Sequence, residues 1–315
     1  MSTDGARNTS ARIQIPERPL SGRHAFIVTA FRDYGMLRRT LQLLDFDYNS
    51  IHLHVDSNSA LPGSDVLGVV KRASLHLTPR VDVRWAGVSM VQAGLTATRS
   101  ALQEADFDYI HLLTESDLPI RPMSEIHSFF REHSGFEFIE YHPDNDGFAQ
   151  YKGQVFHFFA NRRSYRSSKL TKYANHGLAK AQQKVQFQRH PGVRYYHGSA
   201  FWSITRGLAE YVDERADQIL RDYRWTLAPD EVYLHTLVMN SPYRDRLYEF
   251  EIPMISSARY IDWARREGNS PHTITVEDLG EMLSNDGLMF ARKFNPAVDS
   301  EVIDRVCERV LRHSA

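Results

Sequence analysis

Three carboxylates have the types and positions to do acid–base chemistry. Asp230 and Glu231 follow Pro229 at a predicted helix start, and Glu140 lies near the end of a predicted strand. A carboxylate can take the proton from an attacking hydroxyl, and general-base catalysis of this kind contributes roughly 10²- to 10⁴-fold. Two such groups could instead be the acid and base of a glycoside hydrolase. Since an acid pair at a helix start is also typical of a helix cap, the residue types alone leave all three roles open.

Other acidic residues could bind a divalent metal. Glu115 and Asp117, two residues apart directly after a predicted strand, are the candidate ligands. The aspartate pairs at 45–47 and 106–108 have the same spacing, but they precede their strands, which favours loop roles. H-E-x-x-H and C-x-x-C patterns are absent, so no zinc site is expected. The lack of G-x-G-x-x-G, G-x-x-x-x-G-K-[ST] and G-x-S-x-G argues against dinucleotide oxidoreductases, kinases and serine hydrolases.

Alternating strands and helices are predicted to position these residues. The apolar pattern predicts strands at 24–31, 51–55, 81–85, 109–113, 136–141 and 198–205. Helical spacing is found at 34–44, 66–72, 89–104, 124–131, 207–221, 229–239, 275–283 and 300–312. This alternation predicts an α/β fold with a mostly parallel central sheet flanked by helices, in which ligands bind beyond the carboxyl ends of the strands. The polar residues that follow such ends are Arg32, Asp33, Asp56 and the segment from Glu115 to Asp117.

Length and composition favour one globular domain. The chain has 315 residues, 42% of them hydrophobic and 24% charged. We expect a flexible tail at 1–22 and a single domain at 23–315. No apolar run approaches the roughly 20 residues of a membrane-spanning helix, so none is expected. Because Cys307 is the only cysteine, no intrachain disulfide can form, and a cytoplasmic setting is expected.

The segment 147–209 is strongly basic, although the net charge of the chain is −1. It contains eleven Lys and Arg residues and no Asp or Glu. Such a block favours an anionic partner, and an acidic glycan, an anionic membrane surface and nucleic acid are all open. Aromatic residues interleave with the cations, as in nucleic-acid-binding proteins. A nucleic-acid-binding protein that uses this segment is therefore the alternative to an enzyme.

Seven short phrases occur in a fixed order along the chain. They are His54-Val55-Asp56, Ser89 through Ala93 with Gln92-Ala93, Glu115-Ser116-Asp117-Leu118-Pro119-Ile120, Gly198-Ser199-Ala200-Phe201-Trp202, Ala228-Pro229-Asp230-Glu231, Arg259-Tyr260-Ile261-Asp262-Trp263 and Phe290-Ala291-Arg292-Lys293-Phe294. In this order they resemble the core-2/I-branching enzyme family (glycosyltransferase family 14), which also includes the peptide O-xylosyltransferases. The resemblance extends from about His24 to Phe294.

The resemblance implies a GT-A-type fold, a UDP-sugar donor and transfer with inversion by single displacement. Glu231 matches the family's general base. Lys293 matches a lysine that, with an arginine, balances the charge of the departing UDP in place of a metal, so no cofactor is expected. The candidates for the arginine are Arg265, Arg266 and Arg292, with His272 a weaker one. A metal held by Glu115 and Asp117 is the alternative.

The resemblance also suggests which residues contact the sugars. Asp56 and Asp117 would contact the donor, Trp263 would stack on a sugar face of donor or acceptor, and Glu140 would bind the acceptor. We expect a nucleotide-binding half at about 23–122 and an acceptor and catalytic half at about 123–315.

The leading interpretation is an enzyme that moves N-acetylglucosamine from UDP-GlcNAc to a hydroxyl of a glycan or glycolipid. Xylose transfer from UDP-xylose is the alternative within the family. An enzyme of this family is not expected to bind nucleic acid. With one cysteine and no anchor, the chain is expected to be a bacterial, cytoplasmic member that acts in polysaccharide biosynthesis. Eleven uncompensated cations near the acceptor would attract an anionic acceptor or hold the enzyme peripherally at an anionic inner membrane.

Overall fold

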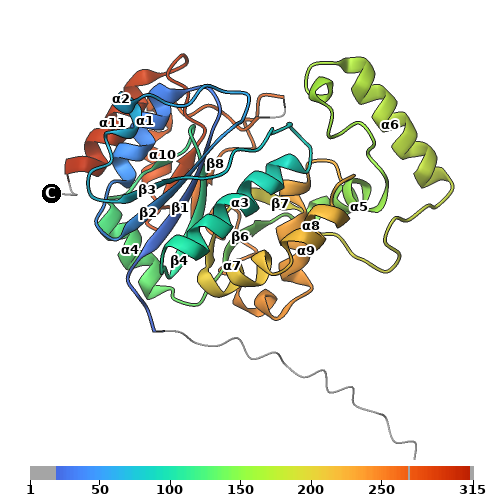
Figure 1. Ribbon diagram of the computed structural model, residues 1–315, viewed down its shortest axis with the longest axis horizontal. Coiled ribbons are helices and arrows are strands. Elements are labelled where there is room, and N and C mark those ends of the chain that lie inside the picture. Colours follow the sequence, from blue (N-terminus) through green and yellow to red (C-terminus); the bar gives the residue numbers. More distant parts are fainter. Residues whose placement is uncertain (1–18, 269, 313–315) are drawn as a thin grey trace, which may run out of the picture.

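A six-stranded sheet in the order β3-β2-β1-β4-β7-β6 forms the centre of the molecule (Figure 1). The computed structural model describes residues 19–268 and 270–312, so most of the tail expected at 1–22 lies outside the described residues. The strands of the sheet are β1 (His24–Ala30), β2 (Asn49–Val55), β3 (Ser74–Leu77), β4 (Tyr109–Thr114), β6 (Phe138–Tyr141) and β7 (Gly198–Thr205).

The strands β3, β2, β1 and β4 are parallel, as expected. His24 in β1 pairs with Asn49 in β2 and with Tyr109 in β4. β7 runs antiparallel to both β4 and β6, so its first residue, Gly198, lies near the carboxyl end of β4. A second sheet contains β5 (Leu118–Pro119), β9 (Phe290–Arg292) and β8 (Arg259–Ile261). The predicted α/β architecture with a mostly parallel central sheet is confirmed.

Helices cover both faces of the central sheet (Figure 1). Ala25 and Ile27 of β1 pack with α3 (Ser89–Glu104), whereas Phe26 and Val28 pack with α1 (Tyr34–Leu44), because side chains alternate between the faces of a strand. Burial on both faces explains why these strands appear in the sequence as continuous apolar runs. The remaining helices of the body are α2 (Ser64–Leu67), α4 (Met123–Glu132), α7 (Arg206–Asp213), α8 (Ala216–Asp222), α9 (Tyr233–Met239), α10 (Leu279–Leu283) and α11 (Ser300–Arg312).

Several predicted elements differ from the structure. The prediction of a strand at 81–85 is wrong. β2 pairs with β3 instead. This pairing ends at Thr78 because Pro79 has no N–H to donate. The stretch at 66–72 forms only the short α2, and the helix expected at 207–221 is interrupted between α7 and α8. The helix expected at 229–239 begins as a separate 3₁₀ turn, η3 (Pro229–Glu231), before α9.

Much of the basic segment folds into a lobe that extends away from the central sheet (Figure 1). We call residues 155–194 the α6 lobe, after the helix α6 (Lys169–Lys184) at its outer edge. The helix α5 (Asp146–Gln154) connects the lobe to β6. Across the described part of the chain, no helix has both the length and the apolar character needed to cross a membrane.

Candidate active site

Glu231 lies in a turn whose backbone is held by its surroundings. Ala228, just before the turn, has a left-handed φ of 44°, and its N–H donates to the carbonyl oxygen of Ala86 at 2.9 Å. A residue other than glycine in this region costs of order 1–3 kcal/mol, so packing must fix it there. Asp230 and Glu231 therefore occupy a turn of their own rather than the first turn of α9.

Two basic side chains hold one oxygen of the Glu231 carboxylate. Lys152 Nζ donates a hydrogen bond to Glu231 Oε2, and His197 Nε2 lies 3.2 Å from the same oxygen. Lys152 Nζ also lies 3.0 Å from His197 Nε2 and 4.4 Å from the centre of the Phe148 ring. Among the residues that the structure describes, Oε1 of Glu231 has no partner, and 32% of the side chain is exposed. The arrangement leaves Oε1 open to an incoming hydroxyl.

The same contacts set the charge of the two acids. Burial raises the pKa of Glu231, but the hydrogen bond with His197 and the charge of Lys152 outweigh it and lower that pKa below its usual range. Burial, and then the charge of Glu231, raise the pKa of the neighbouring Asp230. Glu231 is therefore the acid of the pair that is ionised at neutral pH, as a general base must be.

Glu140 lies in the same cluster but is buried and already bonded. His142 Nε2 lies 2.7 Å from its Oε1, and Ser257 Oγ donates to its Oε2 at 3.2 Å. The rings of His142 and His197 are 5.7 Å apart, which connects Glu140 to the surroundings of Glu231. Its contact with an acceptor stays a prediction.

Gly198 lets these groups come together. A Cβ there would lie 1.9 Å from the carbonyl oxygen of Glu140 and 2.5 Å from Nε2 of His235. These distances are far shorter than van der Waals contact, and a backbone atom cannot rotate aside. Only glycine fits between the two residues.

The two candidate metal ligands each have protein partners. Oε2 of Glu115 accepts from the backbone N–H of Phe31 at 2.9 Å, and Oδ1 of Asp117 accepts from Arg292 Nη1 at 2.7 Å. Within residues 19–268 and 270–312, no group of three or more His, Cys, Asp or Glu side chains could hold a metal. These acids therefore fix the carboxyl ends of β1 and β4, and the independence from metal stays a prediction.

The candidate arginines differ in whether they already pair with acidic residues. Arg292 is half-buried and pairs with Asp117, with its guanidinium 3.9 Å from the centre of the Phe201 ring. Arg265 forms ion pairs with Asp262 and, at 2.7 Å, with Asp278. Arg266 is exposed. His272 also contacts Asp278, at 3.2 Å.

Lys293 lies in a positive environment that includes two arginines the sequence did not single out for this role. Burial lowers its pKa, and the charges of Arg292, Arg32 and Arg166 lower it further, while the charge of Glu267 opposes them. Arg32 follows β1, and Arg166 belongs to the α6 lobe. The position of Arg32 after a strand could have suggested it, whereas the approach of Arg166 depends on tertiary structure. Several cations around one lysine favour an anionic ligand.

Asp56 and Trp263 remain candidates for donor contacts. Oδ1 of Asp56 accepts from both the backbone and the side-chain nitrogen of Asn58, at 2.8 and 2.9 Å, which is the usual geometry of an Asx turn. Trp263 is half-buried, and its Nε1 has no hydrogen-bond partner among the described residues.

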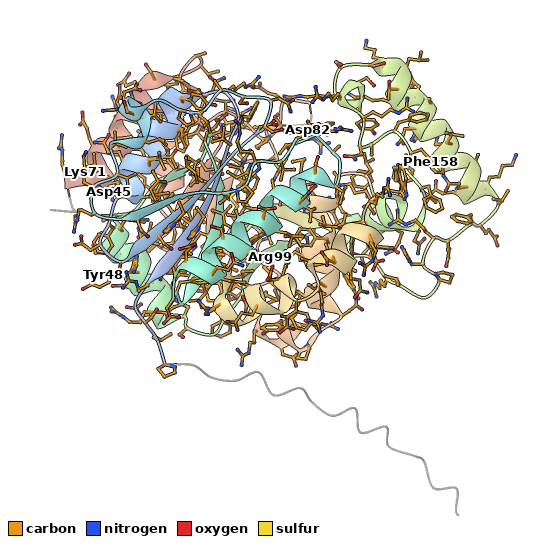
Figure 2. The ribbon with its side chains drawn as sticks, viewed as in Figure 1. Asp45, Tyr48, Lys71, Asp82, Arg99 and Phe158 are labelled. Atoms are coloured by element: carbon orange, nitrogen blue, oxygen red, sulfur yellow. The ribbon has the colours of Figure 1, made fainter. Side chains whose placement is uncertain are left out.

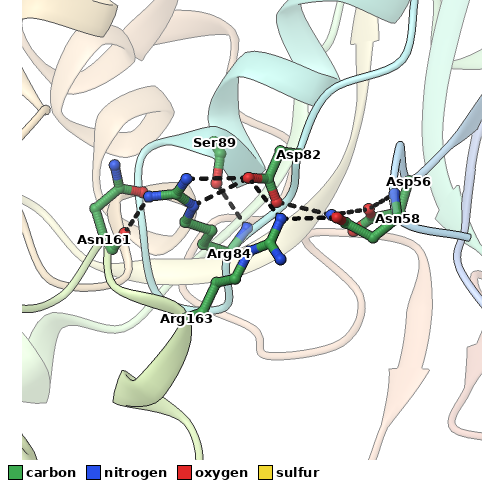
Figure 3. A network of polar contacts seen from close by, with 7 residues as sticks. All are labelled: Asp56, Asn58, Asp82, Arg84, Ser89, Asn161 and Arg163. Atoms are coloured by element: carbon green, nitrogen blue, oxygen red, sulfur yellow. Dashed lines mark hydrogen bonds and ion pairs between the residues drawn. The ribbon is translucent and has the colours of Figure 1, made fainter.

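A polar network joins the α6 lobe to the end of β2 (Figure 3). Arg163 of the lobe donates to Asp82 at 3.1 Å and to Asn58 at 2.7 Å. Arg84 donates to Asp82 at 3.0 Å and to the carbonyl oxygen of Asn161 at 3.1 Å. The hydrogen bonds with Arg84 and Asn58 lower the pKa of Asp82 to about 2. The residues at 81–85 thus serve as an attachment point for the lobe rather than as a strand.

The structure corrects the expectation of eleven uncompensated cations. Four of them pair with acids: Lys152 with Glu231, Arg163 with Asp82, Arg194 with Asp146 and Arg206 with Glu210. Arg189 is half-buried and donates to backbone and hydroxyl oxygens. The cations without an acidic partner in the described residues are Arg162, Arg166, Lys169, Lys172, Lys180 and Lys184. All six belong to the α6 lobe.

Comparisons with known proteins show the family to which this fold belongs. A protein-family model described as Core-2/I-Branching enzyme matches residues 24–285. Xylosyltransferase sqv-6 of Caenorhabditis briggsae is 27% identical over 302 residues, which cover 87% of this chain and 35% of that protein. Human xylosyltransferase 1 is 24% identical over 314 residues, covering 93% of this chain and 30% of that protein. A crystal structure of mouse xyloside xylosyltransferase 1 in its apo form has a TM-score of 0.34 and 11% identity, with 70% of this chain and 83% of that chain covered.

The sheet and the family match together define a GT-A-type glycosyltransferase domain. Because the family model covers most of the chain, the protein belongs to the Core-2/I-branching enzyme family. The chain spans about a third of the length of the curated relatives described above.

Proposed function

We propose that this domain transfers xylose from UDP-xylose to a hydroxyl of a glycan or protein acceptor, with inversion at the anomeric carbon. The observation that carries the reaction type is the Glu231 carboxylate, with Oε2 held by Lys152 and His197 and Oε1 open. The choice of donor rests on the relatives, which are named xylosyltransferases and so support xylose over N-acetylglucosamine.

The geometry of Glu231 supports a single displacement. Oε1 takes the proton of the acceptor hydroxyl while the hydroxyl oxygen attacks the anomeric carbon. The bond between that carbon and the UDP oxygen breaks on the opposite face, and its electron pair leaves with UDP. Lys152 keeps Glu231 ionised before the attack, and His197 helps to orient the carboxylate.

The departing UDP needs positive charge, because negative charge grows on its diphosphate as the bond breaks. We assign this role to Lys293, with Arg32 and Arg166 as the arginines whose charges act on it. Arg292 and Arg265 are less suited, since each already pairs with a buried aspartate.

A donor panel tests the proposal. Thermal unfolding is measured with UDP, UDP-xylose and UDP-GlcNAc, because a ligand that binds only the folded state raises the melting temperature. We expect UDP-xylose to stabilise the protein most. Lys293→Ala should lower the affinity for every UDP ligand by tenfold or more. The exposed Arg38 provides a control, Arg38→Ala, which should change nothing. Preference for UDP-GlcNAc would overturn the donor assignment alone, and the lack of any response to UDP compounds would overturn the function.

A further inference from the structure

The helix α6 attaches to its own domain through polar side chains. Asn175 and Ala179 are its buried residues. Oδ1 of Asn175 accepts from the backbone N–H of Phe159 at 3.2 Å, and Gln182 exchanges two hydrogen bonds with the backbone of Phe156, at 2.8 and 3.0 Å. The inner face of α6 is therefore mainly polar, the reverse of an ordinary amphipathic surface helix.

The outer face of α6 carries an apolar stripe. Its members repeat every three or four residues, which places them on one side of a helix, and they are Leu170, Ala174, Leu178, Ala181 and Val185 at the end of the helix. Leu170 is 79% exposed and Val185 is 74% exposed. No contact within the described chain covers this stripe, so it is available to a partner.

Lysines border the stripe along one edge. Helical geometry puts Lys169, Lys180 and Lys184 on the same side of it, together with Tyr173, which is 72% exposed. The three lysines have no acidic partner among the described residues. An apolar stripe with a lysine border is the pattern of a helix that lies flat in the interface of an anionic membrane.

We propose that α6 docks the domain onto an anionic phospholipid surface, with the apolar stripe in the headgroup region and the lysines against phosphate groups. A second copy of the chain fits less well, since antiparallel pairing of two stripes would bring the lysine borders together. Parallel pairing would set them beside an edge of α6 that has no Asp or Glu. An acidic polysaccharide or a nucleic acid would satisfy the lysines but would leave Leu170 and Val185 in water. Of these partners, only a lipid surface offers both an apolar layer and negative charge.

Docking by α6 would also connect the surface to the chain segment that supplies two partners of Glu231. The helix is inserted in the chain between Lys152 and His197, the two residues that contact Glu231. This consequence rests on the proposed function, whereas docking itself is measured without any donor or acceptor.

Sedimentation with vesicles tests the docking. The chain is mixed with vesicles of phosphatidylcholine, with and without phosphatidylglycerol, at low and physiological salt. We expect binding only to the vesicles that contain phosphatidylglycerol, with weakening as salt rises. K169Q/K180Q/K184Q should reduce the partition coefficient by about 100-fold, at about fivefold for each lysine. L170S/V185S should reduce it by at least tenfold, because the apolar contribution is lost.

A matched control separates local from general charge effects. Lys71, Arg38 and Arg131 are exposed outside the lobe, and Lys71 lies on the opposite side of the molecule from Phe158 of the lobe (Figure 2). The triple change to glutamine at these positions should leave binding unchanged. Circular dichroism and UDP binding confirm that each variant is folded.

Three outcomes would overturn the proposal. One is no binding to the anionic vesicles at low salt. Another is normal binding by L170S/V185S, which would indicate attraction to any polyanion, such as an acidic glycan or RNA. The third is a dimer in solution that L170S/V185S converts to a monomer, which would assign the stripe to a second copy of the chain.

Discussion

At the scale of single residues, the environment of Glu231 determines its chemistry. The carboxylate belongs to a short turn, and its partners come from distant parts of the chain: Lys152 is 79 positions away and His197 is 34 positions away. The sequence alone identified Glu231 as a base only through family resemblance. The lysine and histidine that prepare it could not be predicted, because their approach depends on the folding of the α6 lobe between them.

Replacing Lys152 with methionine should move the acid limb of the pH–rate profile to higher pH. The base works when deprotonated, so the rate falls as pH drops through the pKa of Glu231. Lys152 lowers that pKa, and a lost opposite charge raises a carboxylate pKa by about 1–3 units. The profile is measured from UDP release, with Lys152→Arg as the charge-preserving control. A lower rate with an unmoved acid limb would show that Lys152 has only a structural role.

Gly198→Ala should destabilise the fold by about 2–3 kcal/mol, because the new Cβ would collide with the carbonyl oxygen of Glu140. Gly177 in α6 is the control, since a Cβ there meets nothing within 4 Å. Gly177→Ala should be neutral or should stabilise the helix by about 0.5–1 kcal/mol. Urea unfolding measures both changes, and equal effects of the two substitutions would refute the steric argument.

At the scale of elements, helices and strands with an apolar face toward the core were predictable, whereas β3 and α6 were not. α1, α3 and β7 lie where the periodicity of the sequence places them. β3 was missed, and a strand was expected at 81–85 instead, because Val81 and Val83 resemble a strand although Pro79 ends the ladder. α6 escaped prediction because its apolar stripe faces outward and its contact face is polar.

Buried histidines on the central strands link stability to pH. His24 Nδ1 in β1 lies 3.0 Å from His111 Nε2 in β4, and His111 Nδ1 lies 2.7 Å from Ser203 Oγ in β7. Burial lowers the pKa of both rings well below their usual range, and it lowers the pKa of His52 in β2 to about 3. Since the folded state keeps these rings neutral, only the unfolded state gains protons as pH drops below about 6.5.

The free energy of unfolding should therefore fall between neutral pH and about pH 5. Each of these rings contributes up to about 1.4 kcal/mol per pH unit below an unfolded pKa of about 6.5. Urea unfolding across this pH range measures the slope, and His52→Gln should reduce it by up to about 1.4 kcal/mol per unit. A flat profile would show that protons reach these rings in the folded state.

At the scale of the whole molecule, contacts between the central sheet and the α6 lobe hold the domain together. Arg163 attaches the lobe beside β2, and Arg166 of the same lobe adds its charge to that around Lys293. The pairing of Asp117 with Arg292 joins residues 175 positions apart and connects the central sheet to the second sheet. Composition indicated that the basic segment had an anionic partner, but only the structure separated its paired cations from the six that remain free of acids.

The central claim is that Glu231 is the base of a glycosyl transfer. The most direct measurement is the turnover of Glu231→Gln, with the dissociation constant of UDP determined on the same preparation. We expect kcat to fall by at least about 10²-fold while UDP binding stays within about twofold of the unmodified protein, because the change removes proton transfer and leaves the donor site intact. Turnover close to that of the unmodified protein would contradict the account.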